Sequence, residues 1–175
     1  KPQIPLEDVR PRVRRDFEVI EGGPDRDITD HVTEGSNAAR ALAEMKKAEP
    51  AFAVGPFLQG ARGAYEMILM AFEKGELDRI RHFLSDDVEA SFAEAIAQRD
   101  RDGLTVEASF LGIKELALHD ASFTPDSRFG EIAVRFVADQ TYVVRNKAGE
   151  IVEGSPREVK KTRDIWTFAR QMGSD

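Results

Sequence analysis

The stretch DGLTVEASF, residues 102–110, decides the fold class, because the spacing of apolar residues changes there. Before Gly103 apolar residues recur every three or four positions, as they do in amphipathic helices. After Gly103 they alternate one by one with polar residues, as they do in strands with one buried face. We therefore expect a strand from Leu104 to Phe123, bent by a bulge at Gly112.

The half of the chain before this point is expected to hold three helices. The first runs from Pro56 to Gly75, since proline is tolerated in a first turn and glycine suits a C-terminal cap. A short helix over residues 77–84 follows. A third helix over residues 86–101 is expected to begin with a capping box.

Two more strands are expected beyond the first. Residues 132–144 alternate in the same way, and a third long strand is expected over residues 158–170. Turn residues at 125–127 and 146–149 separate the three strands. Helices followed by antiparallel strands predict an α+β domain, in which three helices pack on one face of a curved sheet.

The first 50 residues differ from the rest. Residues 1–31 contain four prolines, so we expect an extended arm with few contacts to the core. Residues 32–50 are expected to form an attachment helix capped by Thr33 or Ser36. Its thin apolar stripe fits packing on this domain or on a neighbouring chain at least as well as membrane insertion. The domain itself is expected to span residues 51–175.

The composition excludes several classes of protein. The chain has 175 residues, a formal net charge of −7 and no cysteine. An acidic chain is a poor match for nucleic acid, and the lack of cysteine excludes disulfides, thiolate metal sites and a Cys nucleophile. No apolar run approaches the roughly 20 residues that span a bilayer. The chain begins at Lys1 rather than Met, which is typical of a fragment, so this sequence is compatible with a membrane anchor upstream of it.

Residues suited to acid–base or metal chemistry are few and scattered. The three histidines lie far apart, and the acidic run at residues 25–30 lacks the glycine and glutamate of a calcium loop. No nucleophile elbow, phosphate loop or dinucleotide fingerprint is present, so we expect no enzyme activity, cofactor or metal. The alternative is a small-molecule carrier or a pocket enzyme of the isomerase or hydrolase type. It would use an acid or histidine that projects from the sheet, and the candidates are Asp164, His119 and Asp139.

Large apolar side chains on the long helix and on two strands are candidates for lining a cavity between helix and sheet. One layer of helix does not fill a strongly curved sheet to its rim, so an apolar wall remains that suits an acyl chain or an apolar peptide. Plain core packing is the alternative for these side chains. They are Tyr65, Leu69, Phe72, Phe136, Trp166 and Phe168.

Basic side chains of the N-terminal segments are candidates for contact with acidic lipid or an acidic partner. A solvated charge run balanced by neighbouring acids is the alternative. The residues are Arg10, Arg12, Arg14, Arg15, Arg40, Lys46 and Lys47. The arm that carries four of them is also a candidate for contact with a second copy of the chain.

Several stretches together resemble the Tim44-like domain family. The resemblance covers about residues 31–175, and the chain looks most like the bacterial members. The stretches are FLQGARGAY (57–65), ILMAF (68–72), GELD (75–78), LSDDV (84–88) and DIWTFAR (164–170).

The resemblance implies a cone-shaped fold like that of nuclear transport factor two, with a large apolar pocket. It also implies a non-catalytic adaptor of the protein-import motor type. Such an adaptor is peripherally attached to the cytoplasmic or matrix-equivalent face of an inner membrane, with lipid, often cardiolipin, and proteins as partners. In the family, attachment runs through helices that precede the core, here residues 32–48. A ribosome-associated relative is disfavoured by the net charge of −7.

Overall fold

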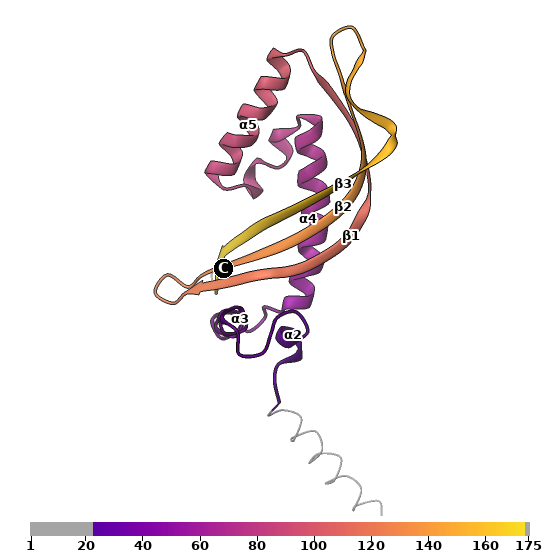
Figure 1. Ribbon diagram of the computed structural model, residues 1–175. Helices are drawn as coiled ribbons and strands as arrows, with labels where there is room; N and C mark the ends of the chain where they lie inside the picture. Colours follow the sequence, from indigo (N-terminus) through magenta and orange to yellow (C-terminus); the bar gives the residue numbers. More distant parts are fainter. Residues whose placement is uncertain (1–22, 174–175) are drawn as a thin grey trace, which may run out of the picture.

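The computed structural model describes residues 23–173 and shows helices followed by one sheet of three strands (Figure 1). This arrangement confirms the predicted α+β class, while the likeness to nuclear transport factor two stays a prediction. The elements in chain order are α2 (Arg26–Thr29), α3 (Asn37–Ala48), α4 (Val54–Lys74), the 3-10 segments η2 (Leu77–Arg79) and η3 (Arg81–Phe83), α5 (Asp86–Arg101), β1 (Thr105–Thr124), β2 (Phe129–Arg145) and β3 (Ile151–Gln171).

The sheet is antiparallel, with strand order β1-β2-β3. The pairing of β1 with β2 shifts between Phe110 and Gly112, so the predicted bulge at Gly112 is confirmed. The φ angle of Gly112 is 147°, in the range that favours glycine. Two further shifts in β1 add to the bend, and the sheet curves around α4 (Figure 1).

The third strand is longer than the sequence predicts. It begins at Ile151 rather than near Glu158. The pairing with β2 jumps around Pro156, because Tyr142 pairs with Ser155 while its neighbour Thr141 pairs with Val159. A proline is tolerated in such an irregular stretch, where it removes no regular ladder hydrogen bond.

Helix α4 lies across the concave face of the sheet (Figure 1). It ends at Gly75, which is left-handed at φ 76° and donates its backbone N–H to the Phe72 carbonyl, so the predicted glycine cap is confirmed. The ring of Tyr65, which is fully buried, stacks on Phe136 of β2 at 4.2 Å between centroids. Such contacts between α4 and the sheet make the main hydrophobic core.

The region after α4 differs from the prediction in two ways. The short helix expected over residues 77–84 is two 3-10 segments that meet at the buried Ile80. The cap of α5 is Ser85, whose hydroxyl accepts from the Val88 N–H, one residue before the predicted start. No side chain of α5 is buried, and Arg99 donates to the last carbonyls of α4 instead.

The segment before α4 also departs from the predicted extended arm. Residues 26–29 form α2, and Ile28 is only 5% exposed, so the expectation of an extended chain with few core contacts is wrong here. Ser36, one of the two predicted caps, begins α3, and the apolar stripe of α3 packs against the core beside β1. These contacts do not by themselves decide the predicted domain limits, which stay a prediction. Residues 1–22 lie outside the described residues.

Candidate functional site

A pocket of about 500 Å³ opens between the N-terminal helices and one end of the sheet. Helix α3, the loop from α3 to α4 and the first turn of α4 form one wall, and parts of β2 and β3 with the residues that follow β3 form the other. Most of its larger lining side chains are apolar. They are Met45, Phe52, Phe57, Ile132, Phe168 and Met172.

Local packing explains why these side chains meet. The Phe57 ring of α4 contacts Phe168 of β3 edge-on, with centroids 5.7 Å apart, and Phe52 of the loop at 6.1 Å. Gly130 of β2 also lines the pocket and is buried, and a Cβ there would lie 3.2 Å from the Met45 sulfur. A side chain at Gly130 would therefore force Met45 to move.

Two charged residues of opposite sign line the pocket. The Arg170 guanidinium of β3 pairs with the Glu49 carboxylate at the end of α3. Glu49 also accepts a hydrogen bond of 3.1 Å from the Gly173 N–H. The charges therefore neutralise each other, and the pocket presents mainly apolar surface to a ligand.

The six residues predicted to line a cavity fall into three groups. Phe168 lines the pocket. Tyr65, Phe136 and Trp166 contact one another, with centroids 4.2–5.9 Å apart, and Leu69 packs against the same core. Phe72 instead contacts Phe92 of α5 at 4.4 Å. A binding role for the six residues stays a prediction.

A row of polar groups follows the buried side of α4. The Tyr65 hydroxyl donates to the Asp164 carboxylate at 2.7 Å and lies 3.2 Å from the Thr162 hydroxyl. Further along, the Gln140 amide donates to the buried Glu73 carboxylate at 3.0 Å. Burial raises the pKa of Tyr65 and of Glu73 above their ordinary values, and nearby Asp164 adds to both shifts.

The candidates for acid–base chemistry are not brought together. Asp164 faces the core and is bonded to Tyr65, whereas Asp139 pairs with Lys161 at 3.4 Å and His119 is exposed. Residues 23–173 contain no group of three or more His, Cys, Asp or Glu side chains that could hold a metal ion. Of the three predicted candidates, Asp164 alone thus faces the interior, and its hydrogen-bonding partner Tyr65 is fully buried.

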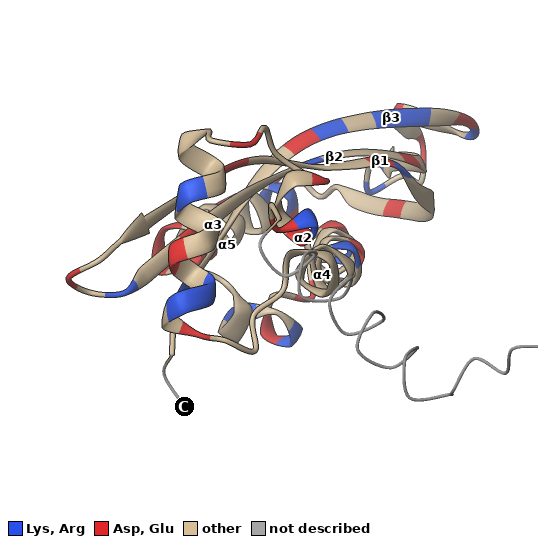
Figure 2. Cartoon of the chain, turned by 90° about the horizontal axis from the view of Figure 1, so that it is seen from below, with Lys and Arg blue, Asp and Glu red and all other residues tan. Residues whose placement is uncertain are grey.

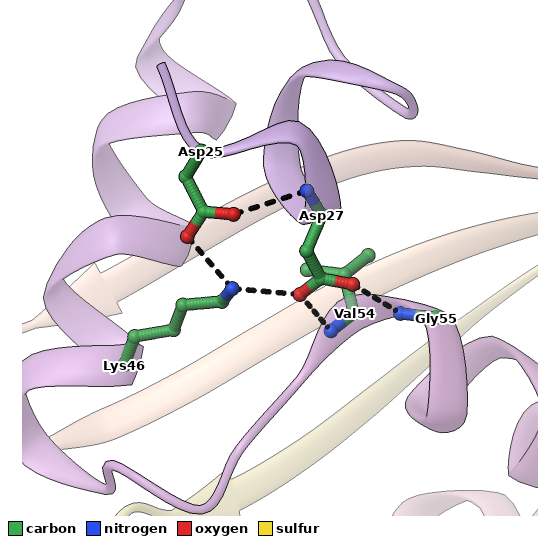
Figure 3. Close-up of polar contacts among 5 residues, drawn as sticks. All are labelled: Asp25, Asp27, Lys46, Val54 and Gly55. Atoms are coloured by element: carbon green, nitrogen blue, oxygen red, sulfur yellow. Dashed lines mark hydrogen bonds and ion pairs between the residues drawn. The ribbon is translucent and has the colours of Figure 1, made fainter. Parts of the chain in front are cut away.

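A second polar cluster joins the N-terminal segment to the pocket wall (Figure 3). The Asp27 carboxylate accepts from the Val54 N–H at 2.7 Å and from the Gly55 N–H at 2.9 Å, so it caps α4 from another element. Lys46 of α3 lies 2.7 Å from Asp27 and 2.8 Å from Asp25. Burial opposes ionisation of Asp27, but the hydrogen bonds from Lys46, Gly55 and Val54 outweigh it and lower its pKa from 3.8 to about 2.

The sequence profile of the Tim44-like domain matches residues 38–175, which is most of the chain. The chain belongs to the Tim44-like domain family. The resemblance predicted from the motifs of α4 and β3 is thereby confirmed.

The relatives of this Tim44-like domain include subunits of a mitochondrial translocase. The human "mitochondrial import inner membrane translocase subunit TIM44" is 28% identical over 155 residues, which cover 84% of this chain and 34% of that protein. The Arabidopsis thaliana subunit TIM44-1 is 22% identical over 155 residues, covering 86% of this chain and 32% of that protein. The match therefore spans about a third of the length of these relatives.

One solved structure with some likeness to this Tim44-like domain is the intermembrane-space region of the chloroplast protein ARC6. It has a TM-score of 0.40 and 10% sequence identity, over 63% of this chain and 80% of that chain.

The basic residues predicted to contact lipid are placed differently from one another in the Tim44-like domain. Lys46 is held by Asp25 and Asp27, and Lys47 pairs with Glu44 at 3.1 Å on an exposed face. Arg40 donates to the Gly35 carbonyl and to Asn37. The remaining four lie outside the described residues, and they are Arg10, Arg12, Arg14 and Arg15.

Sequence reasoning missed most of the residues that line the pocket. Phe52 stands in the short loop after Pro50, and a phenylalanine in such a loop was the available signal. The capping of α4 by Asp27 had no signal in the sequence, because the two partners are 27 and 28 residues apart.

Proposed function

We propose that this Tim44-like domain is a non-catalytic adaptor that associates peripherally with an inner membrane, on its cytoplasmic or matrix-equivalent face. The relatives named above are inner-membrane translocase subunits, which supports a role in protein transport. No helix among residues 23–173 is long and apolar enough to cross a bilayer.

The pocket beside α3 is the observation that carries this proposal. Its volume of about 500 Å³ falls within the range of ligand sites in proteins. Glu49 and Arg170 neutralise each other there, so the pocket suits an acyl chain or an apolar peptide segment better than a polar metabolite. A lipid chain or an apolar segment of a partner protein is its proposed occupant.

Basic side chains of the N-terminal segment supply the proposed second contact, with an anionic lipid such as cardiolipin. Each basic side chain contributes about 1 kcal/mol of binding free energy near an anionic surface, and salt screens this attraction. Lys46 contributes less, because it is already held by Asp25 and Asp27. The N-terminal arm, residues 1–31, is also the proposed contact with a second copy of the chain.

A second candidate function is a small-molecule carrier or pocket enzyme that uses Asp164. The inward position of this carboxylate and its hydrogen bond from Tyr65 favour that candidate. Tyr65 is fully buried, however, and Phe136 and Trp166 cover its ring. The pocket beside α3 is therefore the better supported site.

Filling the pocket tests the first proposal. Ala53 lines the pocket with an extended backbone that accepts a large side chain, so Ala53→Trp is expected to weaken sedimentation with cardiolipin-containing phosphatidylcholine vesicles. Ala90→Trp, on the exposed face of α5, is the matched control and should bind as the wild type does. Unchanged binding of Ala53→Trp at both low and high salt would refute the role of the pocket.

A further inference from the structure

The free side of β3 is an uncovered sheet edge. β3 pairs with β2 on one side only, so half of its backbone N–H and C=O groups point away from the sheet. Helices α3 and α4 pack against β1, whereas no described helix packs to a comparable extent on β3. The edge therefore offers hydrogen-bonding groups that the described residues leave largely unused.

Side chains on the outer face of β3 form a regular row. Val159, Lys161, Arg163 and Ile165 share one face because they lie two residues apart. The alternate residues Thr162 and Asp164 face the core with Tyr65, so this row faces away from the helices. Val159 and Ile165 are 57% and 53% exposed, a large fraction for β-branched apolar side chains.

The same stretch concentrates positive charge in an acidic protein. From Arg157 to Arg163 there are four basic residues and one acid, Glu158, while the whole chain has a net charge of −7. Figure 2 shows this basic run along β3. Lys161 pairs with Asp139 at 3.4 Å, whereas Arg163 has no ion-pair partner among residues 23–173.

Protection against self-association explains only part of this pattern. Lysines, a proline and an irregular register are common devices that stop edge strands from pairing. They account for the charges and for Pro156, but not for the exposed apolar residues at both ends of the row. A second copy of β3 would bring like charges together, so the edge disfavours this chain as its own partner.

We propose that the β3 edge binds an extended acidic segment of a partner protein, which adds to the sheet as a fourth strand. Opposed residues of neighbouring strands interact directly, so the partner would match the row with residues in the order apolar, acidic, acidic, apolar at every second position. This inference is separate from the pocket and from lipid binding, since none of the four residues of the row lines the pocket.

A synthetic peptide tests the proposal on the full chain. The probe is the fluorescein-labelled peptide TVTETETVT, and the control peptide TVTKTKTVT keeps its apolar ends. Fluorescence anisotropy is expected to show at least tenfold tighter binding of the Glu peptide. A Glu peptide N-methylated at alternate backbone nitrogens should bind at least tenfold more weakly, because it cannot donate to the edge.

Charge reversal on the edge gives the matched comparison. Lys161→Glu combined with Arg163→Glu should abolish the preference for the Glu peptide. Arg62→Glu combined with Lys74→Glu changes the net charge equally on exposed positions of α4 and should keep the preference. Circular dichroism and melting temperature establish that both variants fold.

Three results would overturn the proposal. The first is no binding of the Glu peptide at millimolar concentration. The second is equal binding of the N-methylated peptide, which would mean charge attraction without strand addition. The third is that charge reversal weakens binding of the protein to anionic phosphatidylglycerol vesicles but leaves its binding to the Glu peptide unchanged. That result would mean that the edge binds lipid rather than a protein segment.

Discussion

The link between Asp27 and α4 gives the sharpest prediction for stability. The pKa of Asp27 falls from 3.8 to about 2 on folding, and each unit is worth about 1.4 kcal/mol, so its charge stabilises the fold by about 2 kcal/mol. The side chain is 28% exposed, so solvent screening reduces this figure only in part. Asp27→Asn removes the charge and turns an amide N–H₂ toward backbone N–H donors. We expect its melting temperature to fall by about 4–8 °C at pH 7.

The pH dependence separates this mechanism from a general loss of packing. A carboxyl whose folded pKa is lowered stabilises the protein above its unfolded pKa, and this stability is lost as the pH falls toward about 2. The difference in melting temperature between the wild type and Asp27→Asn should therefore be constant above about pH 5 and shrink below pH 4. Thermal unfolding followed by circular dichroism measures it, with Asp30→Asn as the control on the exposed C-cap of α2. Equal melting temperatures for Asp27→Asn and Asp30→Asn would refute the capping role.

Other substitutions test the core and its polar row. Trp166→Ala removes a half-buried aromatic that contacts Tyr65, and urea unfolding should show a loss of about 3 kcal/mol, the low end for a large aromatic; a loss below about 1 kcal/mol would contradict a core role. Tyr65→Phe removes the donor to Asp164 and should cost about 1.5–3 kcal/mol, and a neutral result in urea would mean that this hydrogen bond adds nothing. Glu73 has a raised pKa in the fold, so its ionisation destabilises the protein as the pH rises above about 4.3. Glu73→Gln should therefore raise the melting temperature at pH 7 and flatten its pH dependence, whereas Glu66→Gln on the exposed face of α4 should do neither.

Local signals in the sequence predicted most of the elements. The change of period at Gly103, the bulge at Gly112 and the caps at Ser36 and Gly75 each depend on residues within a few positions of one another. Where local signals were weak, the observed boundaries of the elements differ from the predicted ones. Residues 77–84 became two 3-10 segments, because burial of Ile80 decides their course more than helix propensity does.

The candidate site depended on contacts that the sequence does not display. Phe168 was predicted to line a cavity, but the pocket lies toward Met45 and Phe52, on elements that the sequence assigned to an attachment helix and the start of the domain. Helix α3 had two possible partners, and the structure shows its apolar stripe packed against this chain's own core beside β1. The hydrophobic pattern of a helix predicts that one face will be buried, but it does not predict the surface against which that face packs.

The sequence by itself determined the class of the fold, the order of its three longer helices and three strands, the family and the residues able to form an apolar core. Backbone periodicity, caps and turns are local properties, so they can be recognised along the chain. The tertiary structure alone decided that Asp27 caps α4, that Glu73 meets Gln140, and where the pocket opens. Each of these depends on segments that are far apart in the sequence and meet only in the folded chain. The pocket also depends on the bend of the sheet, to which the three register shifts in β1 contribute.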